Sequence, residues 1–154
     1  MATPTYSRLA SWLVEKGIPF QTLNHEPVFT SEQAAAARGT PLGSGAKALV
    51  VKAADKFLLL VLPADRKLSS KKAQKGLGGK GLRFATKEEL LTLTGLEPGA
   101  VPPFGTIFGL PTYLDPALSA HETINFNAGD HATSISMAYT DFLRAEDPAL
   151  LEMS

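Results

Sequence analysis

Segments with helical spacing of apolar residues alternate along the chain with shorter runs that are apolar throughout. Leu9, Trp12 and Leu13 recur at the spacing of one helix face, and Gly17 follows them as a C-terminal cap. Thr86 and Glu89 have the spacing of a capping box at the start of another helix. Periodicity and capping residues together predict helices at residues 5–16, 31–39, 68–77 and 86–94, and a terminal helix that starts at residues 141–144.

The apolar runs predict strands. AKALVVKA and KFLLLVLP are separated only by Ala54 and Asp55, and their density of valine and leucine predicts a buried hairpin. Further strands are predicted at residues 18–23, 82–85, 106–111, 112–115, 123–127 and 133–139. Because helices gather toward the ends and strands in the middle, we expect an α+β fold: one curved mixed β-sheet flanked by helices, without regular βαβ winding.

One stretch fits neither a helix nor a central strand. Residues 95–105, GLEPGAVPPFG, contain three prolines and three glycines between elements that are expected to be ordered. Proline lacks the backbone N–H that a helix or sheet would use, so this stretch is predicted to be a shaped loop. No internal repeat or linker divides the chain, and a length of 154 residues predicts one domain over residues 1–154.

Composition narrows the possible functions. The chain has no cysteine, which excludes a disulfide framework, a thiolate zinc site and a cysteine nucleophile. Hydrophobic residues make up 44%, yet the N-terminus lacks the apolar stretch of a signal peptide and no run reaches the length of a membrane span. We therefore expect a globular protein with a cytoplasmic location.

Charge is balanced overall but uneven locally. The 15 basic and 15 acidic residues cancel, whereas residues 66–87 hold eight lysines and arginines and no Asp or Glu. Such a local cationic surface can bind phosphates even in a neutral protein. The alternative is an ordinary solvated helix and loop, which like-charge runs often form.

Familiar catalytic motifs are absent. GTPLGSGAK resembles a phosphate-binding loop, but Ala48 stands where that motif has Ser or Thr, and a helix rather than a strand is predicted before it. Ser44 lacks the glycine that a nucleophile elbow has two places earlier. His25, His121 and His131 have no short paired spacing, so we expect no metal and no cofactor.

The order of several segments carries a family resemblance. A lysine stands at the head of the segment AKALVVKAADKFLLLVLPADRKL, which is followed in order by LRFATKEEL and TGLEPGAVPPFG. On these segments, over about residues 20–145, the chain resembles the YbaK family and the editing domain inserted in bacterial prolyl-tRNA synthetases. In that family the strand lysine, here Lys47, is the residue tied to deacylation, and a Gly-x-x-x-Pro loop maps to Gly99 and Pro103. The segment NFNAGDHATSISM resembles the strand pair that closes the pocket, with Asn127 where many single-domain members have histidine.

The resemblance implies an aminoacyl-tRNA deacylase that hydrolyses the ester of a mischarged tRNA carrying a small amino acid. Lys47 would be the catalytic cation, facing the developing oxyanion or the terminal phosphate, while backbone groups of the loop position the substrate and water. The substrate-binding residues would be Gly99, Ala100, Val101, Pro102, Pro103, Phe104, Gly105, Asn127, Gly129 and His131.

Binding of the tRNA is assigned to the basic segment, namely Lys67, Lys71, Lys72, Lys75 and Lys80. The expected partners are a mischarged tRNA and an aminoacyl-tRNA synthetase. Two other functions stay open at this point: a noncatalytic tRNA-binding or synthetase-associated module, and a small-molecule binding protein whose apolar pocket is shaped by the proline-glycine loop. The sequence does not distinguish among alanine, serine, threonine, cysteine and nonprotein amino acids as the edited residue.

Overall fold

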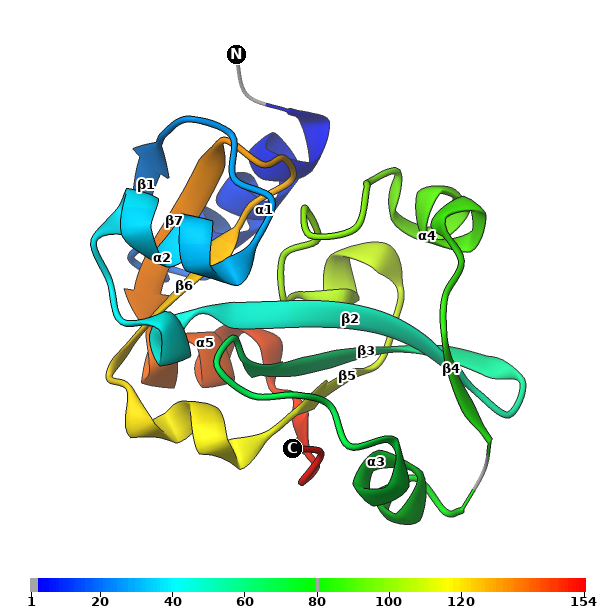
Figure 1. Ribbon diagram of the computed structural model, residues 1–154. Coiled ribbons are helices and arrows are strands. Elements are labelled where there is room, and N and C mark those ends of the chain that lie inside the picture. The colour runs from blue at the N-terminus through cyan, green and yellow to red at the C-terminus, as the bar shows by residue number, and fades with distance from the viewer. Residues whose placement is uncertain (1–2, 80) are drawn as a thin grey trace.

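A computed structural model describes residues 3–79 and 81–154 of the chain. Its strands are β1 (Gln21–Asn24), β2 (Ala46–Ala53), β3 (Lys56–Pro63), β4 (Leu82–Phe84), β5 (Thr112–Leu114), β6 (Thr123–Asn127), β7 (Thr133–Ala138) and β8 (Ala149–Leu150). They form two sheets rather than the single sheet expected: a mixed sheet in the order β4-β2-β3-β5-β8 and an antiparallel sheet in the order β1-β7-β6 (Figure 1). The sheets touch where Gly45 bridges Asn125.

The helices lie close to their predicted positions and confirm the α+β class. They are α1 (Pro4–Glu15), α2 (Ser31–Arg38), α3 (Ser70–Gly76), α4 (Lys87–Thr94) and α5 (Tyr139–Glu146), with 3₁₀ turns η1 (Leu42–Ser44), η2 (Gly105–Phe108) and η3 (Pro116–Ala120). Thr86 and Glu89 form the expected capping box of α4, and Gly39 ends α2 with a φ of 69°. In the part of the chain that the structure describes, no helix is both long and apolar enough to cross a bilayer.

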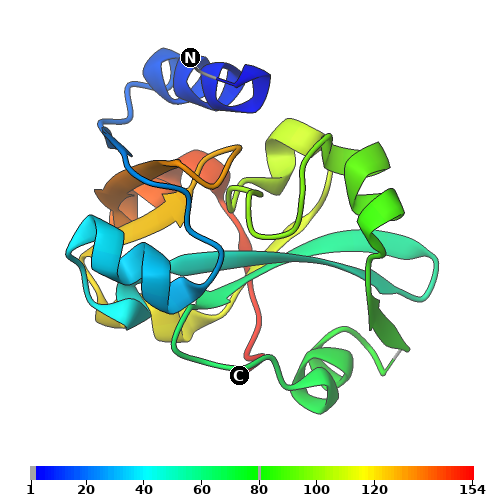
Figure 2. The same cartoon turned by 45° about the horizontal axis from the view of Figure 1, so that its top comes forward.

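The hairpin of β2 and β3 has the bounds that its apolar runs predict, with Ala46 opposite Pro63 and Ala53 opposite Lys56. β3 pairs with β2 and β5 along its edges and is buried on both faces, because one apolar cluster packs on each side of the sheet. Leu59 and Val61 pack into the main core, while Leu58, Leu60 and Leu62 pack on the other side against a smaller cluster that includes Ala73 of α3. The continuous apolar run of β3 follows from this position. Figures 1 and 2 show α3 and α4 on opposite faces of the sheet.

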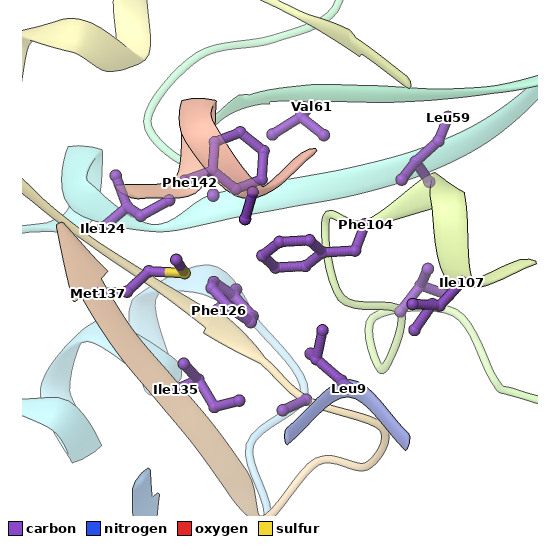
Figure 3. Packing of buried hydrophobic residues seen from close by; sticks show 14 of the residues in the cluster. Leu9, Leu59, Val61, Phe104, Ile107, Ile124, Phe126, Ile135, Met137 and Phe142 are labelled. Atoms are coloured by element: carbon purple, nitrogen blue, oxygen red, sulfur yellow. The ribbon is translucent and has the colours of Figure 1, made fainter. Parts of the chain in front are cut away.

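Aromatic residues fill the centre of the main core. The ring of Phe104 lies 5.5 Å from that of Phe126 and 5.1 Å from that of Phe142, both in edge-to-face geometry (Figure 3). Leu9 of α1 and Ile135 of β7 close the cluster from the side of the small sheet. This core joins both sheets and fixes the position of the loop that carries Phe104.

One predicted strand is wrong. Residues 106–111 were expected to be extended, but the backbone turns there as η2, because the Leu110 N–H donates to the Gly105 carbonyl at 2.9 Å. The Gly105 N–H in turn donates to Thr112 Oγ1 at 2.9 Å, and the Thr106 N–H donates to the buried Glu146 carboxylate at 3.1 Å. Hydrogen bonds to residues distant in sequence thus outweigh the local preference of an apolar run for a strand.

Candidate active site

A cavity of about 210 Å³ opens at the junction of the two sheets. Its walls come from six places: the segment before α2 together with that helix, η1 with Gly45 after it, the start of β2, Ala64 after β3, the proline-glycine loop, and the end of β6 with the turn that follows it. Figure 2 shows α2 and the first part of β2 side by side in this region. Segments that are far apart in sequence therefore contribute to one concave site, as is usual for small-molecule sites.

Lys47 lines this cavity from the second position of β2. Its half-buried ammonium group donates a hydrogen bond to the backbone carbonyl of Arg66, at 2.5 Å. Burial lowers the pKa of Lys47, Lys67 acts in the same direction, and the carboxylates of Asp65 and Glu32 oppose the shift. An ammonium group has three N–H donors, so Lys47 keeps two that the Arg66 carbonyl does not use.

The proline-glycine loop is attached to the end of the small sheet. Gly99 has a φ of 86°, a left-handed conformation that favours glycine, and its carbonyl accepts from Asn127 Nδ2 at 2.8 Å. The Gly129 N–H donates to the Ala100 carbonyl at 2.9 Å. These two bonds hold the loop in a defined position beside the cavity.

Arg38 is a site residue that the sequence reasoning missed. It lines the cavity from the last turn of α2, donating from Nη2 to Asn127 Oδ1 at 3.0 Å and from Nε to Ser134 Oγ at 2.9 Å. Burial lowers the pKa of Arg38 to about 10. Since Asn127 also binds the Gly99 carbonyl, Arg38 indirectly supports the loop. An arginine before a helix-ending glycine is common, and the sequence offers no signal that this one points inward.

His131 lines the cavity next to Gly99. Its Nε2 lies 3.5 Å from Glu97 Oε2, and its ring centroid lies 4.8 Å from that of Phe29. Its Nδ1 is buried and has no hydrogen-bond partner among the residues that the structure describes. A buried polar atom without a partner is uncommon in native proteins, so this atom is a candidate for a contact with substrate.

The structure brings together five of the sequence-predicted site residues: Lys47, Gly99, Val101, Asn127 and His131 all line the cavity. The other predicted substrate-binding residues do not line it; they are Ala100, Pro102, Pro103, Phe104, Gly105 and Gly129. Their assignment to substrate binding stays a prediction.

The loop residues among these lie outside the cavity because of the direction in which the loop turns. After Val101 the chain runs into the core, where Phe104 is fully buried and the backbone of Gly105 packs against Thr112. A Cβ on Gly129 would lie 2.7 Å from Thr3 Oγ1, so glycine there permits close packing against the start of α1.

The basic segment lies mostly away from the cavity. Lys71, Lys72 and Lys75 are exposed on α3, and Lys72 Nζ donates to the Ser154 carbonyl at 2.7 Å. Lys67 is exposed in the loop between β3 and α3, next to the Arg66 carbonyl that binds Lys47. Lys80, the fifth predicted tRNA contact, lies outside the described residues.

Comparison with known proteins identifies similar sequences and folds. Residues 25–145 match the model of a family described as the aminoacyl-tRNA editing domain. The chain is 35% identical over 152 residues to the multifunctional Ser/Thr-tRNA deacylase ProXp-y of Escherichia coli K12, which covers 96% of this chain and 91% of the relative. It is also 35% identical over 101 residues to the proline–tRNA ligase of Shouchella clausii, covering 66% of this chain and 18% of the ligase.

A solved structure agrees with these sequence matches. A protein proposed to be a trans-editing enzyme for prolyl-tRNA synthetase superposes with a TM-score of 0.89 and 26% identity, covering 100% of this chain and 99% of that one. The similarity therefore extends over the fold of the whole chain, both sheets included, rather than over one shared substructure.

Proposed function

This chain belongs to the aminoacyl-tRNA editing domain family, and from that premise we propose how its cavity hydrolyses the ester between a small, wrong amino acid and a tRNA. The chain is a hydrolase of the aminoacyl-tRNA ester bond, as its E. coli relative is named. The observation that carries the assignment of the site is the meeting of Lys47, Gly99 and Asn127 in one cavity.

Lys47 is proposed to be the catalytic cation. Attack of water on the ester carbonyl, with its proton passing to solvent, gives a tetrahedral intermediate with negative charge on the former carbonyl oxygen. Collapse of this intermediate breaks the bond to the ribose oxygen, which takes a proton back from solvent. One of the two free N–H donors of Lys47 can bind the former carbonyl oxygen while the donor on the Arg66 carbonyl stays in place. Burial makes this interaction stronger than it would be in bulk water, because the local dielectric is lower.

The proline-glycine loop is proposed to position the aminoacyl group and the water. Its backbone is fixed by the bonds from Asn127 to Gly99 and from Gly129 to Ala100. An aminoacyl ester is already reactive toward water, so a fixed geometry and one cation account for catalysis without a serine or cysteine nucleophile.

We propose serine and threonine as the edited amino acids, the two that the name of the E. coli relative gives. The cavity of about 210 Å³ suits a small side chain, and His131 Nδ1, which is buried and without a partner among the described residues, can bind a side-chain hydroxyl once the ring turns to expose it to the cavity. A site that hydrogen-bonds a hydroxyl discriminates against the analogue that lacks it, because its own polar group is then left unpaired.

Two substitutions of His131 separate its two ring nitrogens. Asparagine can place an amide atom where histidine has Nδ1, because both atoms are two bonds from Cβ. Glutamine is longer and places its amide near the position of Nε2, beside Glu97. We expect His131→Gln to lower the ratio of kcat/KM for seryl-tRNA over alanyl-tRNA by about 2- to 10-fold, the range of one net hydrogen bond. His131→Asn should retain most of that ratio. If both variants keep the ratio of the parent, the hydroxyl is bound elsewhere.

The lysines of α3 are proposed to contact the tRNA backbone. Replacing Lys71, Lys72 and Lys75 with Gln should weaken tRNA binding and reduce the slope of log affinity against log salt by roughly one for every phosphate that no longer has a lysine partner. Turnover at saturating tRNA should change little, because phosphate contacts position the nucleic acid without taking part in the chemical step.

A control for this triple variant removes the same charge elsewhere, at Lys16, Lys52 and Lys56, and should leave the salt slope unchanged. A filter-binding or fluorescence titration at several salt concentrations measures both slopes. Equal slopes for the α3 variant and the parent would mean that α3 is only a solvated surface and that the tRNA docks through another face.

The proposed function is tested by incubating the purified protein with tRNAs charged with serine, threonine, alanine, cysteine and proline. Release of free amino acid should be fastest for serine or threonine. Binding of tRNA without any release would instead favour the noncatalytic module, and absence of both would favour a small-molecule binding protein. A cytoplasmic location and an association with an aminoacyl-tRNA synthetase stay predictions, supported by the related domain within proline–tRNA ligases.

A further inference from the structure

The rim of the cavity carries an exposed aromatic residue that lies outside both core clusters. Phe29 lines the cavity, yet 72% of its surface is open to solvent. Its one aromatic contact in the described chain is with His131, at 4.8 Å between ring centroids and 40° between ring planes. Large apolar side chains are exposed singly on many proteins, so exposure alone explains nothing. Phe29, however, lies at the mouth of the proposed active site, where an exposed ring can contact the substrate.

The backbone around Phe29 is fixed before any substrate binds. The Val28 N–H donates to the His131 carbonyl at 2.8 Å, and the Phe29 N–H donates to Gln33 Oε1 at 2.8 Å. Thr30 then caps α2 through the Gln33 N–H at 3.1 Å. The ring is thus presented from a segment that is tied to both α2 and the turn after β6, which limits the entropy lost when a ligand packs on it.

The chemistry of the substrate places a nucleobase near this ring. An aminoacyl group is esterified to the ribose of the terminal nucleotide of a tRNA, so its base is only one sugar away from the bond that is cut. When the amino acid fills the cavity and its carbonyl faces Lys47, the sugar and base must lie at the rim. The other exposed aromatic side chain in the described chain, Phe84 on β4, does not line the cavity.

We propose that Phe29 is a stacking platform for the terminal nucleobase of the tRNA, with His131 supporting the inner edge of its ring. This rests on the proposed deacylase function and adds a nucleoside subsite to it. Bases stack on exposed aromatic rings with little sequence preference, and removing such a ring reduces affinity by about 5- to 150-fold per base.

The kinetic test compares substrates with and without a base. For the amino acid that the parent releases fastest, the substrates are its ester on adenosine and its methyl ester. Phe29→Ala should lower kcat/KM for the adenosine ester by about 5- to 150-fold, mainly through KM, and leave the methyl ester unchanged. Phe29→Tyr should restore the parent value, because it keeps the ring. Phe84→Ala is the matched control and should have no effect on either substrate.

Two results would overturn the proposal. An equal loss on both esters would mean that Phe29 only shapes the cavity, and no loss on the adenosine ester would mean that the base docks elsewhere. Failure of the parent to hydrolyse any aminoacyl ester would instead contradict the deacylase function itself.

A binding measurement separates the subsite from catalysis. In Phe29→Trp, the fluorescence of the introduced indole should be quenched saturably by AMP and not by ribose 5-phosphate, after subtraction of the signal of Trp12 measured in the parent. Identical responses to AMP and ribose 5-phosphate would show that the ring does not recognise a base. This titration needs no turnover and so remains informative if the rates of ester hydrolysis are low.

Discussion

Replacing Lys47 with alanine is expected to lower kcat/KM for deacylation by about 100- to 1,000-fold, the usual effect of removing one group that stabilises an oxyanion. The fold should survive, because the half-buried side chain makes one hydrogen bond, to the Arg66 carbonyl, and one net bond contributes about 1 kcal/mol. Single-turnover release of amino acid from the best substrate measures the loss, and thermal unfolding measures the stability.

The matched control is Lys52→Ala, five residues on in the same strand. Lys52 lies over the ring of Phe57 and does not line the cavity, so its removal should change activity little. If Lys47→Ala hydrolyses the substrate as fast as the parent, Lys47 takes no part in the mechanism. Arg38, which also lines the cavity, would then be the candidate for the catalytic cation.

The pH profile of the parent gives a second check on Lys47. The reaction needs the charged form of the lysine, so the rate should fall as the pH rises through the pKa of Lys47. Burial lowers that pKa from the ordinary value of 10.5, so the fall should begin at a lower pH than for an exposed lysine. The background hydrolysis of the ester by hydroxide, measured with Lys47→Ala, is subtracted first.

Replacing Phe104 with alanine is expected to have the largest effect on stability, a loss of about 3–5 kcal/mol in the free energy of unfolding. Phe104 is 0% exposed, and its ring contacts those of Trp12, Phe126 and Phe142. Denaturant unfolding measures the loss. Phe104→Leu should lose less, and the exposed Phe84→Ala should change stability by about 0.5 kcal/mol or less.

This experiment also decides between two roles for Phe104. The sequence pattern assigned it to substrate binding, whereas the structure places it in the core behind the loop. If the core role holds, activity should decline in proportion to the folded fraction. A variant that is stable but inactive would instead indicate that Phe104 contacts the substrate.

Local signals were sufficient for the helices α1 to α5 and for the central hairpin. The β2–β3 hairpin was predicted with its observed bounds because a continuous apolar run needs a position buried on both faces. The capping box at Thr86 located α4. The strand β8 was not predicted because it has only two residues, Ala149 and Leu150, and exists by pairing with β5. The division into two sheets depends on long-range pairing, which no local pattern encodes.

The residues of the site also fall into two groups: those that a sequence pattern indicates and those that only the structure identifies. Lys47 and Gly99 were located through a resemblance between motifs, and the structure places both on one cavity. Arg38 and Phe29 were missed because an arginine in a last helical turn and a phenylalanine in a loop have ordinary roles in most proteins. Their significance comes from which way they point, and tertiary packing decides that.

The pairing of β1 with β7 has a consequence for how the protein is made. The hairpin of β2 and β3 closes between neighbouring segments, but His25, just after β1, binds Ser134 of β7 across 109 positions of sequence. Contacts between distant residues form late, since a long loop must be ordered before they do. On the ribosome, β1 must therefore wait for β7 to be translated. The cavity has walls from both sheets, so the site is complete only after the strands of the small sheet have been translated and have paired.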